Sequence, residues 1–153
     1  MSTVVTLDRR PNSLPAVSID DFIAAAGARL ADRIIIAGAA HLEFLISLTR
    51  RGFMSAICQS PSRSPHIPNS KADAILAPAV TDEASLVAIL DGLGAELRPG
   101  GALVIEAAPA FDLSTAALRL RPALLARGFA GLESLGASMW RARKAAAPMV
   151  RAA

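Results

Sequence analysis

Short apolar runs alternate along this chain with segments in which apolar residues recur every three or four positions, a pattern typical of strands alternating with helices. The run at residues 33–38 is continuous and β-branched, as in a parallel strand that is buried on both faces. Ser18 can cap the helix that follows it, because Asp20 and Asp21 are favourable in a first turn. The pattern predicts strands at residues 33–38, 53–58, 73–77 and 102–107, helices at residues 20–31, 40–51, 82–97 and 114–127, and a final hairpin at residues 129–133 and 138–143.

Strands that alternate with helices imply a parallel sheet with right-handed crossovers and helices on both faces. The final hairpin would add an antiparallel edge. The sequence therefore predicts a three-layer α/β fold with a mostly parallel sheet and an antiparallel C-terminal hairpin. We expect a flexible arm at residues 1–17, one domain at residues 18–144 and a basic tail at residues 145–153.

Composition narrows the classes of function. Of the 153 residues 53% are hydrophobic and 19% charged, which excludes disorder of the whole chain. Only 4% are aromatic, so platforms for stacking bases are scarce and a nucleic-acid partner is not expected. No uninterrupted apolar run reaches the roughly 18 residues of a membrane span, so no membrane association is expected either. The single cysteine, Cys58, excludes an intramolecular disulfide, and the absence of a signal-peptide pattern favours the cytoplasm.

One segment carries a family resemblance. Residues 97–101 read Leu-Arg-Pro-Gly-Gly and precede a buried apolar strand at residues 102–106. This unit resembles the turn before the fifth strand of class I S-adenosylmethionine (SAM) methyltransferases. The order of elements at residues 33–52, 72–106 and 124–144 is similar to that family as well. The resemblance implies a Rossmann-like fold, with SAM at the carboxyl ends of the first strands and Gly38 as the first glycine of its cofactor loop.

The same resemblance shows where this chain departs from the family. The family's first strand usually ends in an acid followed by a GxGxG loop, whose glycines let the backbone approach SAM closely. Here the acid position falls on Ile36, and Ala40 and Leu42 stand at the second and third glycines. We expect the Leu42 side chain to fill the place of the cofactor. The acid that would hold the ribose falls on Cys58 or Gln59, neither of which offers the charge-assisted pair of a carboxylate.

A second departure is length. The family usually has a helix and a further strand between its second and fourth strands, whereas this chain has only the 13 residues 59–71, three of them prolines. That length is too short for both elements, and proline opposes each of them. We therefore expect a fold that lacks one helix–strand unit. The adenine pocket would be missing or supplied by another subunit.

Candidate cofactor-binding residues remain at this end of the sheet. They are Gly38, His41, Glu43 and Gln59. His41 and Glu43 could hold a ligand or act as an acid and base, but they are also ordinary residues of a helix's first turn. The two histidines are too far apart in sequence, and too poor in neighbouring acids, to predict a metal site.

Other polar residues are candidates for chemistry with equally plausible structural roles. Glu106 and Asp112 flank the end of a strand and could form a carboxylate pair for acid/base work. Asp73 opens a strand, where packing and capping would explain it. Cys58 is expected to be an inert, buried thiol. Pro78 stands where the family has its catalytic loop but brings no polar side chain, and we assign no catalytic residue.

The leading hypothesis is a degenerate methyltransferase-like domain that is not catalytic, needs no cofactor and acts as a binding or assembly module. A homodimer is expected, because loss of a covering helix leaves apolar sheet surface to bury. The alternative is an active SAM-dependent methyltransferase with an atypical pocket, with SAM as its cofactor. A third possibility is a binder of anions or nucleic acid that uses the basic tail and the helix start after Gly38. The sequence does not specify the small-molecule ligand.

Overall fold

The computed structural model describes residues 18–37, 41–61, 71–136 and 138–145, so the predicted arm and nearly all of the predicted tail lie outside the described residues. The helices are α1 (Ile19–Ala26), α2 (His41–Arg50), α3 (Glu83–Leu93) and α4 (Leu113–Ala126), with a short 3-10 helix, η1 (Gly94–Glu96), after α3. The strands are β1 (Ile34–Ile36), β2 (Ala56–Cys58), β3 (Ala72–Val80), β4 (Leu97–Ala107), β5 (Phe129–Ser134) and β6 (Met139–Lys144).

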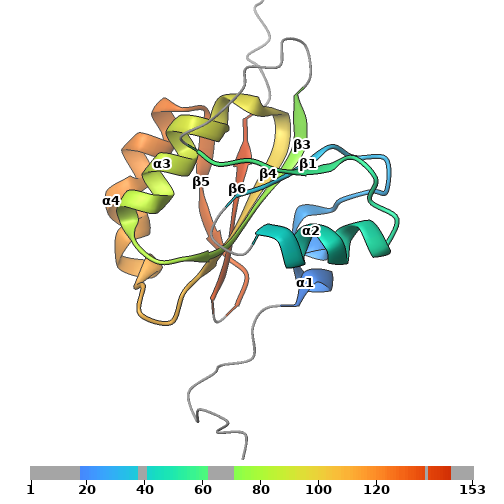
Figure 1. Ribbon diagram of the computed structural model, residues 1–153. Coiled ribbons are helices and arrows are strands. Elements are labelled where there is room, and N and C mark those ends of the chain that lie inside the picture. Colours follow the sequence, from blue (N-terminus) through green and yellow to red (C-terminus); the bar gives the residue numbers. More distant parts are fainter. Residues whose placement is uncertain (1–17, 38–40, 62–70, 137, 146–153) are drawn as a thin grey trace, which may run out of the picture.

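The described strands form one sheet of six, in the order β2-β1-β3-β4-β6-β5. The first four strands along this order are parallel, and β6 pairs antiparallel with both β4 and β5. Helices α3 and α4 cover one face and α1 and α2 the other (Figure 1). The predicted fold is therefore confirmed: a mostly parallel α/β sheet with an antiparallel C-terminal hairpin, in which no helix or further strand of the described residues lies between β2 and β3.

The apolar run at residues 33–38 is continuous because β1 is buried on both of its faces. Its three isoleucines alternate between the two faces, since successive side chains of a strand point in opposite directions. Ile34 and Ile36 belong to the apolar core under α1 and α2, and Ile35 belongs to the core under α3 and α4. The ring of Phe22 in α1 meets that of Phe44 in α2 edge to face, with the centroids 5.0 Å apart.

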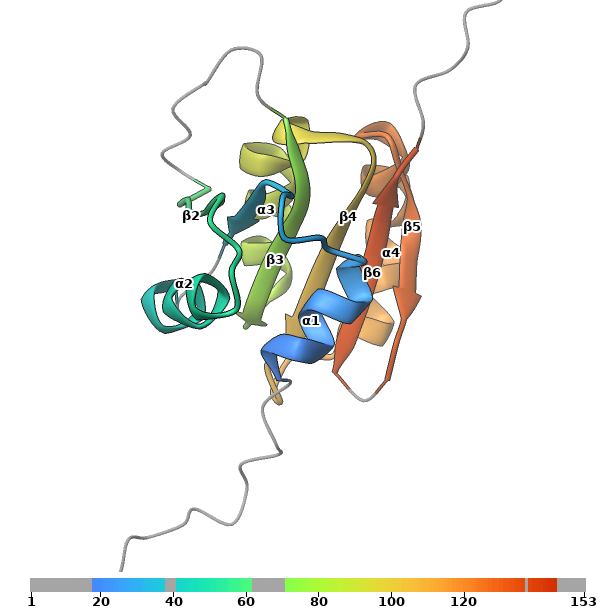
Figure 2. The ribbon, with the colours of Figure 1, turned by 90° about the vertical axis from the view of Figure 1, so that its right-hand side faces the viewer.

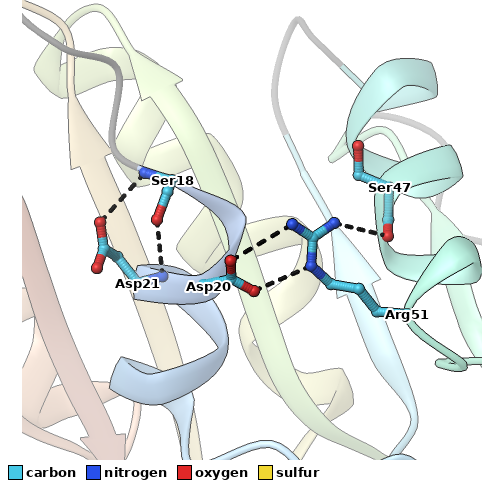
Figure 3. A network of polar contacts seen from close by, with 5 residues as sticks. All are labelled: Ser18, Asp20, Asp21, Ser47 and Arg51. Atoms are coloured by element: carbon cyan, nitrogen blue, oxygen red, sulfur yellow. Dashed lines mark hydrogen bonds and ion pairs between the residues drawn. The ribbon is translucent and has the colours of Figure 1, made fainter.

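Polar contacts fix α1 against α2 at the surface (Figure 3). Ser18 and Asp21 form a reciprocal capping box at the start of α1, with both bonds 3.2 Å long. Arg51, just past α2, forms an ion pair with Asp20, with 2.9 Å from Nε to Oδ1, and also donates to the carbonyl oxygen of Ser47. Asp20, one of the two acids predicted to favour the first turn, therefore also connects two helices.

Two helices end earlier than the sequence predicts. Helix α1 stops at Ala26, because Gly27 adopts the left-handed conformation that ends helices, with φ of 62°. Helix α3 stops at Leu93, and residues 94–96 tighten into η1 before β4 begins. The segment predicted as a helix at residues 82–97 thus ends in a 3-10 turn. Over so few residues, a 3-10 turn and an α-helix have the same hydrophobic spacing, so the sequence pattern does not separate them.

The segment at residues 97–101 belongs to β4 and is not the end of a helix. Leu97 pairs with Ala72 of β3, but Ala102 already pairs with Ala74, so the extra residues of β4 bulge outward between these pairs. At this bulge Gly100 adopts a φ of 80°, in the left-handed region that favours glycine. Gly101 then returns against the neighbouring strand so closely that a Cβ there would lie 2.9 Å from the Asp73 carbonyl oxygen. Both glycines of the motif are therefore required by geometry.

Asp73 joins three strands at this end of the sheet. Its Oδ2 accepts a hydrogen bond of 2.8 Å from the backbone N–H of Arg33, which precedes β1. Its other carboxylate oxygen forms an ion pair with Arg98, in the bulge of β4. The structural role that the sequence suggested for this residue agrees with these contacts.

The short connection between β2 and β3 packs directly on α3. A Cβ added to Gly92 of α3 would lie 2.2 Å from the Pro61 carbonyl oxygen. Glycine in a helix interior is unfavourable by itself, so its presence here is explained by this close approach. The described part of the connection therefore approaches α3 so closely that only glycine fits at position 92.

Candidate functional site

The candidate site lies at the carboxyl ends of the parallel strands, where ligands bind in open α/β sheets. Strands β1, β2, β3 and β4 all end at this edge of the sheet (Figure 2). Of the predicted cofactor-binding residues, Gly38 lies outside the described residues, as does Ala40. His41 opens α2, but its side chain is also outside what the structure describes. The geometry of the site therefore comes from the remaining residues at this edge.

Ile36 occupies the position of the acid that would end the first strand. Its side chain is fully buried, in the same apolar core as Phe22 and Phe44. A carboxylate there would lose its hydration without a partner, which is strongly unfavourable. The last residue of β1 is thus built for packing and does not present a polar group toward a ligand.

The spacing of apolar residues predicts that the helix at residues 40–51 packs through Leu42, Leu45, Ile46 and Thr49, but α2 packs against the core through a different face. Phe44 and Leu48 are its buried residues, while Leu42 is 67% exposed and Ile46 is exposed as well. The expectation that Leu42 fills the place of the cofactor stays a prediction, because Gly38 and Ala40, which would frame that place, lie outside the described residues. Glu43 also points to solvent in the first turn of this helix.

Gln59 follows the end of β2, where the ribose-binding acid of the family would fall. Its backbone N–H donates to the carbonyl oxygen of Ile36 over 3.0 Å, which extends the β1–β2 pairing by one residue. Gln59 is only 8% exposed. Among the residues that the structure describes, it is the polar residue that is buried at this edge of the sheet. Gln59 is thus packed into the protein at this edge, and its role as a ligand contact stays a prediction.

Cys58 differs from the expectation of a buried thiol. The residue is exposed, because β2 is the edge strand of the sheet and ends there. Neighbouring atoms still desolvate the sulfur enough to raise the pKa of the Cys58 thiol. The thiol consequently stays protonated at neutral pH, and a protonated thiol is a poor nucleophile.

A bulge at the end of β3 was not predicted. Ala77 pairs with Ile105 and Val80 with Ala107, so β3 has one residue more than β4 across this stretch. Ala79 adopts a φ of 53°, which is uncommon for a residue other than glycine. Its N–H donates to Oε1 of Glu106 over 3.0 Å. The sequence held one signal for this bulge: Pro78 cannot donate a ladder hydrogen bond, so regular pairing was bound to fail nearby.

Glu106 and Asp112 therefore have structural roles that the predicted carboxylate pair did not anticipate. Glu106 accepts the bond from the β3 bulge described above. Asp112 caps α4, where its Oδ2 accepts from the Thr115 hydroxyl over 2.6 Å and its Oδ1 accepts from the Thr115 backbone N–H over 3.2 Å. Hydrogen bonds from Thr115, first from its hydroxyl and then from its backbone, lower the pKa of Asp112. A carboxylate held ionised in this way is unsuited to act as a general acid.

Asp82 plays the same part at the start of α3. Its Oδ1 accepts a bond of 2.7 Å from the backbone N–H of Ser85, and this bond is the largest cause that lowers the pKa of Asp82. The two helices that begin at this edge after β3 and β4 thus each start with an ionised aspartate that bonds its own helix.

Among the residues that the structure describes, no three His, Cys, Asp or Glu side chains lie close enough together to hold a metal ion. No helix in the same part of the chain is long and apolar enough to cross a membrane.

No protein-family model matches this sequence, and no curated protein does so either. Solved methyltransferase structures are similar to it in three dimensions. MycE methyltransferase from the mycinamycin biosynthetic pathway, in complex with Mg and SAH, has a TM-score of 0.51 at 12% identity; the match covers 83% of this chain and 47% of that one. The antibiotic-resistance methyltransferase Kmr has a TM-score of 0.49 at 18% identity, covering 86% of this chain and 94% of that one.

An O-methyltransferase family protein from Burkholderia thailandensis has a TM-score of 0.48 at 12% identity, over 85% of this chain and 59% of that one. This chain thus spans about half of MycE and somewhat more of the Burkholderia protein. At such identities a likeness concerns the fold alone. The strand order, the antiparallel final hairpin and the likeness to MycE together show that the chain has the Rossmann-like fold of class I SAM-dependent methyltransferases, without the helix–strand unit between β2 and β3.

Proposed function

We propose that this chain is a methyltransferase-like domain that does not transfer methyl groups and acts as a binding or assembly module. The observation that carries the proposal is Ile36, which stands fully buried in an apolar core where the family places an acid near the cofactor. Three carboxylates near the same edge support it, because each already bonds the chain's own backbone. They are those of Asp82, Glu106 and Asp112.

Isothermal titration with SAM and with its demethylated product SAH tests this proposal directly. We expect no saturable heat for either compound up to millimolar concentration. A methyltransferase with known SAM affinity, titrated in the same buffer, serves as the positive control, and a cooperative thermal transition shows that the protein is folded. Binding of SAM at micromolar concentration would overturn the proposal.

The alternative function, an active SAM-dependent methyltransferase with an atypical pocket, is favoured by one observation. The buried Gln59 amide lies after β2 and could form a hydrogen bond with a ribose hydroxyl. MycE, whose fold this chain shares in part, was solved in complex with Mg and SAH. If SAM binds, Gln59→Leu should weaken the binding, whereas the exposed Glu43→Gln tests the other described candidate. SAM binding that neither substitution changes would count against this pocket.

An assembly role predicts a homodimer. Exposed apolar side chains lie on α2, at Leu42 and Ile46, and near the edge strand β2, at Met54 and Ile57. Light scattering after size exclusion should give the mass of a dimer, and Ile46→Glu should shift it to that of a monomer. The matched control is Leu125→Glu, an exposed position on α4 across the sheet. A wild-type monomer at every concentration would refute the dimer.

A further inference from the structure

A hollow at the free edge of the sheet is formed by a bulge in β5. Phe129 pairs with Lys144 and Leu132 with Ala142, so β5 has one residue more than β6 between these pairs. The bulge includes Gly131, which has a φ of 118° and no atom within 4 Å of the position a Cβ would take. A missing side chain at a bulged edge strand leaves space that a ligand can enter.

The hollow measures about 470 Å³, within the range of small-molecule pockets. Residues of α4 line one side and residues of β5 and β6 line the other. They are Ala117, Leu118, Arg121, Ala130, Gly131, Leu132, Glu133, Arg141 and Arg143. β5 is the last strand in the order of the described sheet, so no strand of the described residues pairs with its outer edge beside the hollow.

The charge of this hollow is unbalanced. Arg141 forms an ion pair with Glu133 over 2.9 Å and also donates to the carbonyl oxygen of Ala25, so it is held in place. Arg121 and Arg143 form no ion pair or side-chain hydrogen bond with any residue that the structure describes. The lining thus contains three guanidinium groups and one carboxylate, and two of those guanidinium groups are available to a ligand.

A second hollow of about 320 Å³ adjoins this one through Arg143 and gives a useful comparison. Its lining includes Arg29 and Arg98, but also Asp32 and Asp73. Arg98 forms an ion pair with Asp73, and the Asp32 carboxylate, which accepts a hydrogen bond from the backbone N–H of Arg29, adds a second negative charge to this hollow. The positive excess is therefore smaller there, and the hollow at the β5 bulge is the better anion site.

We propose that the hollow at the β5 bulge binds the phosphate group of a small phosphate monoester. Such a group carries about −1.5 to −2 charges at neutral pH, which two arginines can balance. The planar guanidinium group also fits phosphate oxygens through paired hydrogen bonds. Leu118, which is 78% exposed on α4, offers an apolar surface for the organic part of the ligand. The lining contains no aromatic side chain on which a base could stack, which favours a small molecule over nucleic acid.

Titration with phenyl phosphate and with inorganic phosphate, followed by calorimetry or by NMR chemical shifts, tests this site. We expect saturable binding of both, with phenyl phosphate several-fold tighter. Arg121→Gln and Arg143→Gln should each weaken both ligands about tenfold or more, equivalent to about 1.4 kcal/mol. Leu118→Ser should remove the advantage of phenyl phosphate and leave inorganic phosphate unchanged.

Arg50→Gln is the matched control, because Arg50 is exposed in the last turn of α2 and lines neither hollow. Its binding should stay within about twofold of the wild type, since only general charge attraction is lost. Equal losses in Arg50→Gln and Arg121→Gln would overturn the proposal, as would the absence of saturable binding. Single-stranded RNA that displaces phenyl phosphate and binds more tightly would also overturn it, in favour of a nucleic-acid site. Circular dichroism melting of each variant excludes unfolding as the cause of any loss.

Discussion

Replacing Gly92 with alanine tests whether the connection after β2 packs against helix α3. Helix propensity alone predicts that Gly92→Ala stabilises the protein by about 1 kcal/mol, because glycine is unfavourable in a helix interior. The structure predicts the opposite sign. The new Cβ would lie 2.2 Å from the Pro61 carbonyl oxygen, 2.9 Å from its carbonyl carbon and 3.0 Å from its Cα.

The clash cannot be relieved without loss elsewhere. Helix α3 is fixed by the buried side chains on its other face, among them Leu86 and Leu90, so moving the helix would open the core. Displacing Pro61 would disturb the residues after β2, where the Gln59 N–H bonds the carbonyl oxygen of β1. Overpacking of this kind costs about 1–3 kcal/mol, and a contact this short belongs at the upper end. After subtraction of the helix-propensity gain, the expected net loss is about 2 kcal/mol.

Urea denaturation measures this loss, with Gly94→Ala as the matched control. Gly94 has an ordinary helical φ of −57°, and a Cβ there would meet only the Phe129 ring, at 3.4 Å. Gly94→Ala should therefore be neutral or stabilising by up to about 1 kcal/mol. Hydrogen exchange at the Gln59 amide should also accelerate in Gly92→Ala and stay unchanged in the control. If both variants gain the same stability, Pro61 does not pack on α3 and the reasoning fails.

Three further predictions concern the core, the β4 bulge and the helix caps. Gly101→Ala should lower the free energy of unfolding by about 1–3 kcal/mol, because its Cβ would lie 2.6 Å from Cδ1 of Leu97; an unchanged urea midpoint would contradict this. Phe22→Ala, at a fully buried site, should cost about 3–5 kcal/mol in the same assay, and a loss below about 1 kcal/mol would show that α1 is not part of the core. The lowered pKa values of Asp82 and Asp112 mean that the folded state binds fewer protons than the unfolded state as pH nears their ordinary value. Their contribution should be complete above the ordinary carboxyl pKa and disappear as pH falls through the lowered values; thermal melting of Asp112→Asn, whose stability should fall less on acidification than that of the wild type, checks this.

The fold was predictable largely because each of the four parallel strands contains a run of apolar residues. Alternating periods indicated strands and helices in the right order, and the 13 residues at 59–71 indicated the missing unit. Element ends were less predictable. The helix expected to end at Leu97 stops at Leu93 and is followed by a 3-10 turn. The prediction ran too long because a 3-10 turn and an α-helix have similar hydrophobic spacing over a few residues.

The candidate site was predicted less completely. The strand ends that meet at this edge were identified, and Gln59 lies there as a buried polar residue. The β3 bulge was missed, because the uncommon φ of Ala79 goes with a hydrogen bond from its N–H to Glu106, which is 27 residues away in sequence. The packed face of α2 was also wrong: Phe44 is buried there where Leu42 was expected, since hydrophobic spacing leaves two possible faces on a helix rich in apolar residues.

The sequence by itself determined the α/β class, the parallel direction of most strands and the short link between β2 and β3. These features follow from the hydrophobic period and from the lengths of the segments between strands. Only the tertiary structure decided which polar groups are already used. Asp73, Glu106 and Asp112 bond backbone groups of their own fold, whereas Arg121 and Arg143 line one hollow and form no ion pair with an acid of the described residues. The physical reason is that a charge's role depends on its neighbours in space, and those neighbours come from segments far apart along the chain.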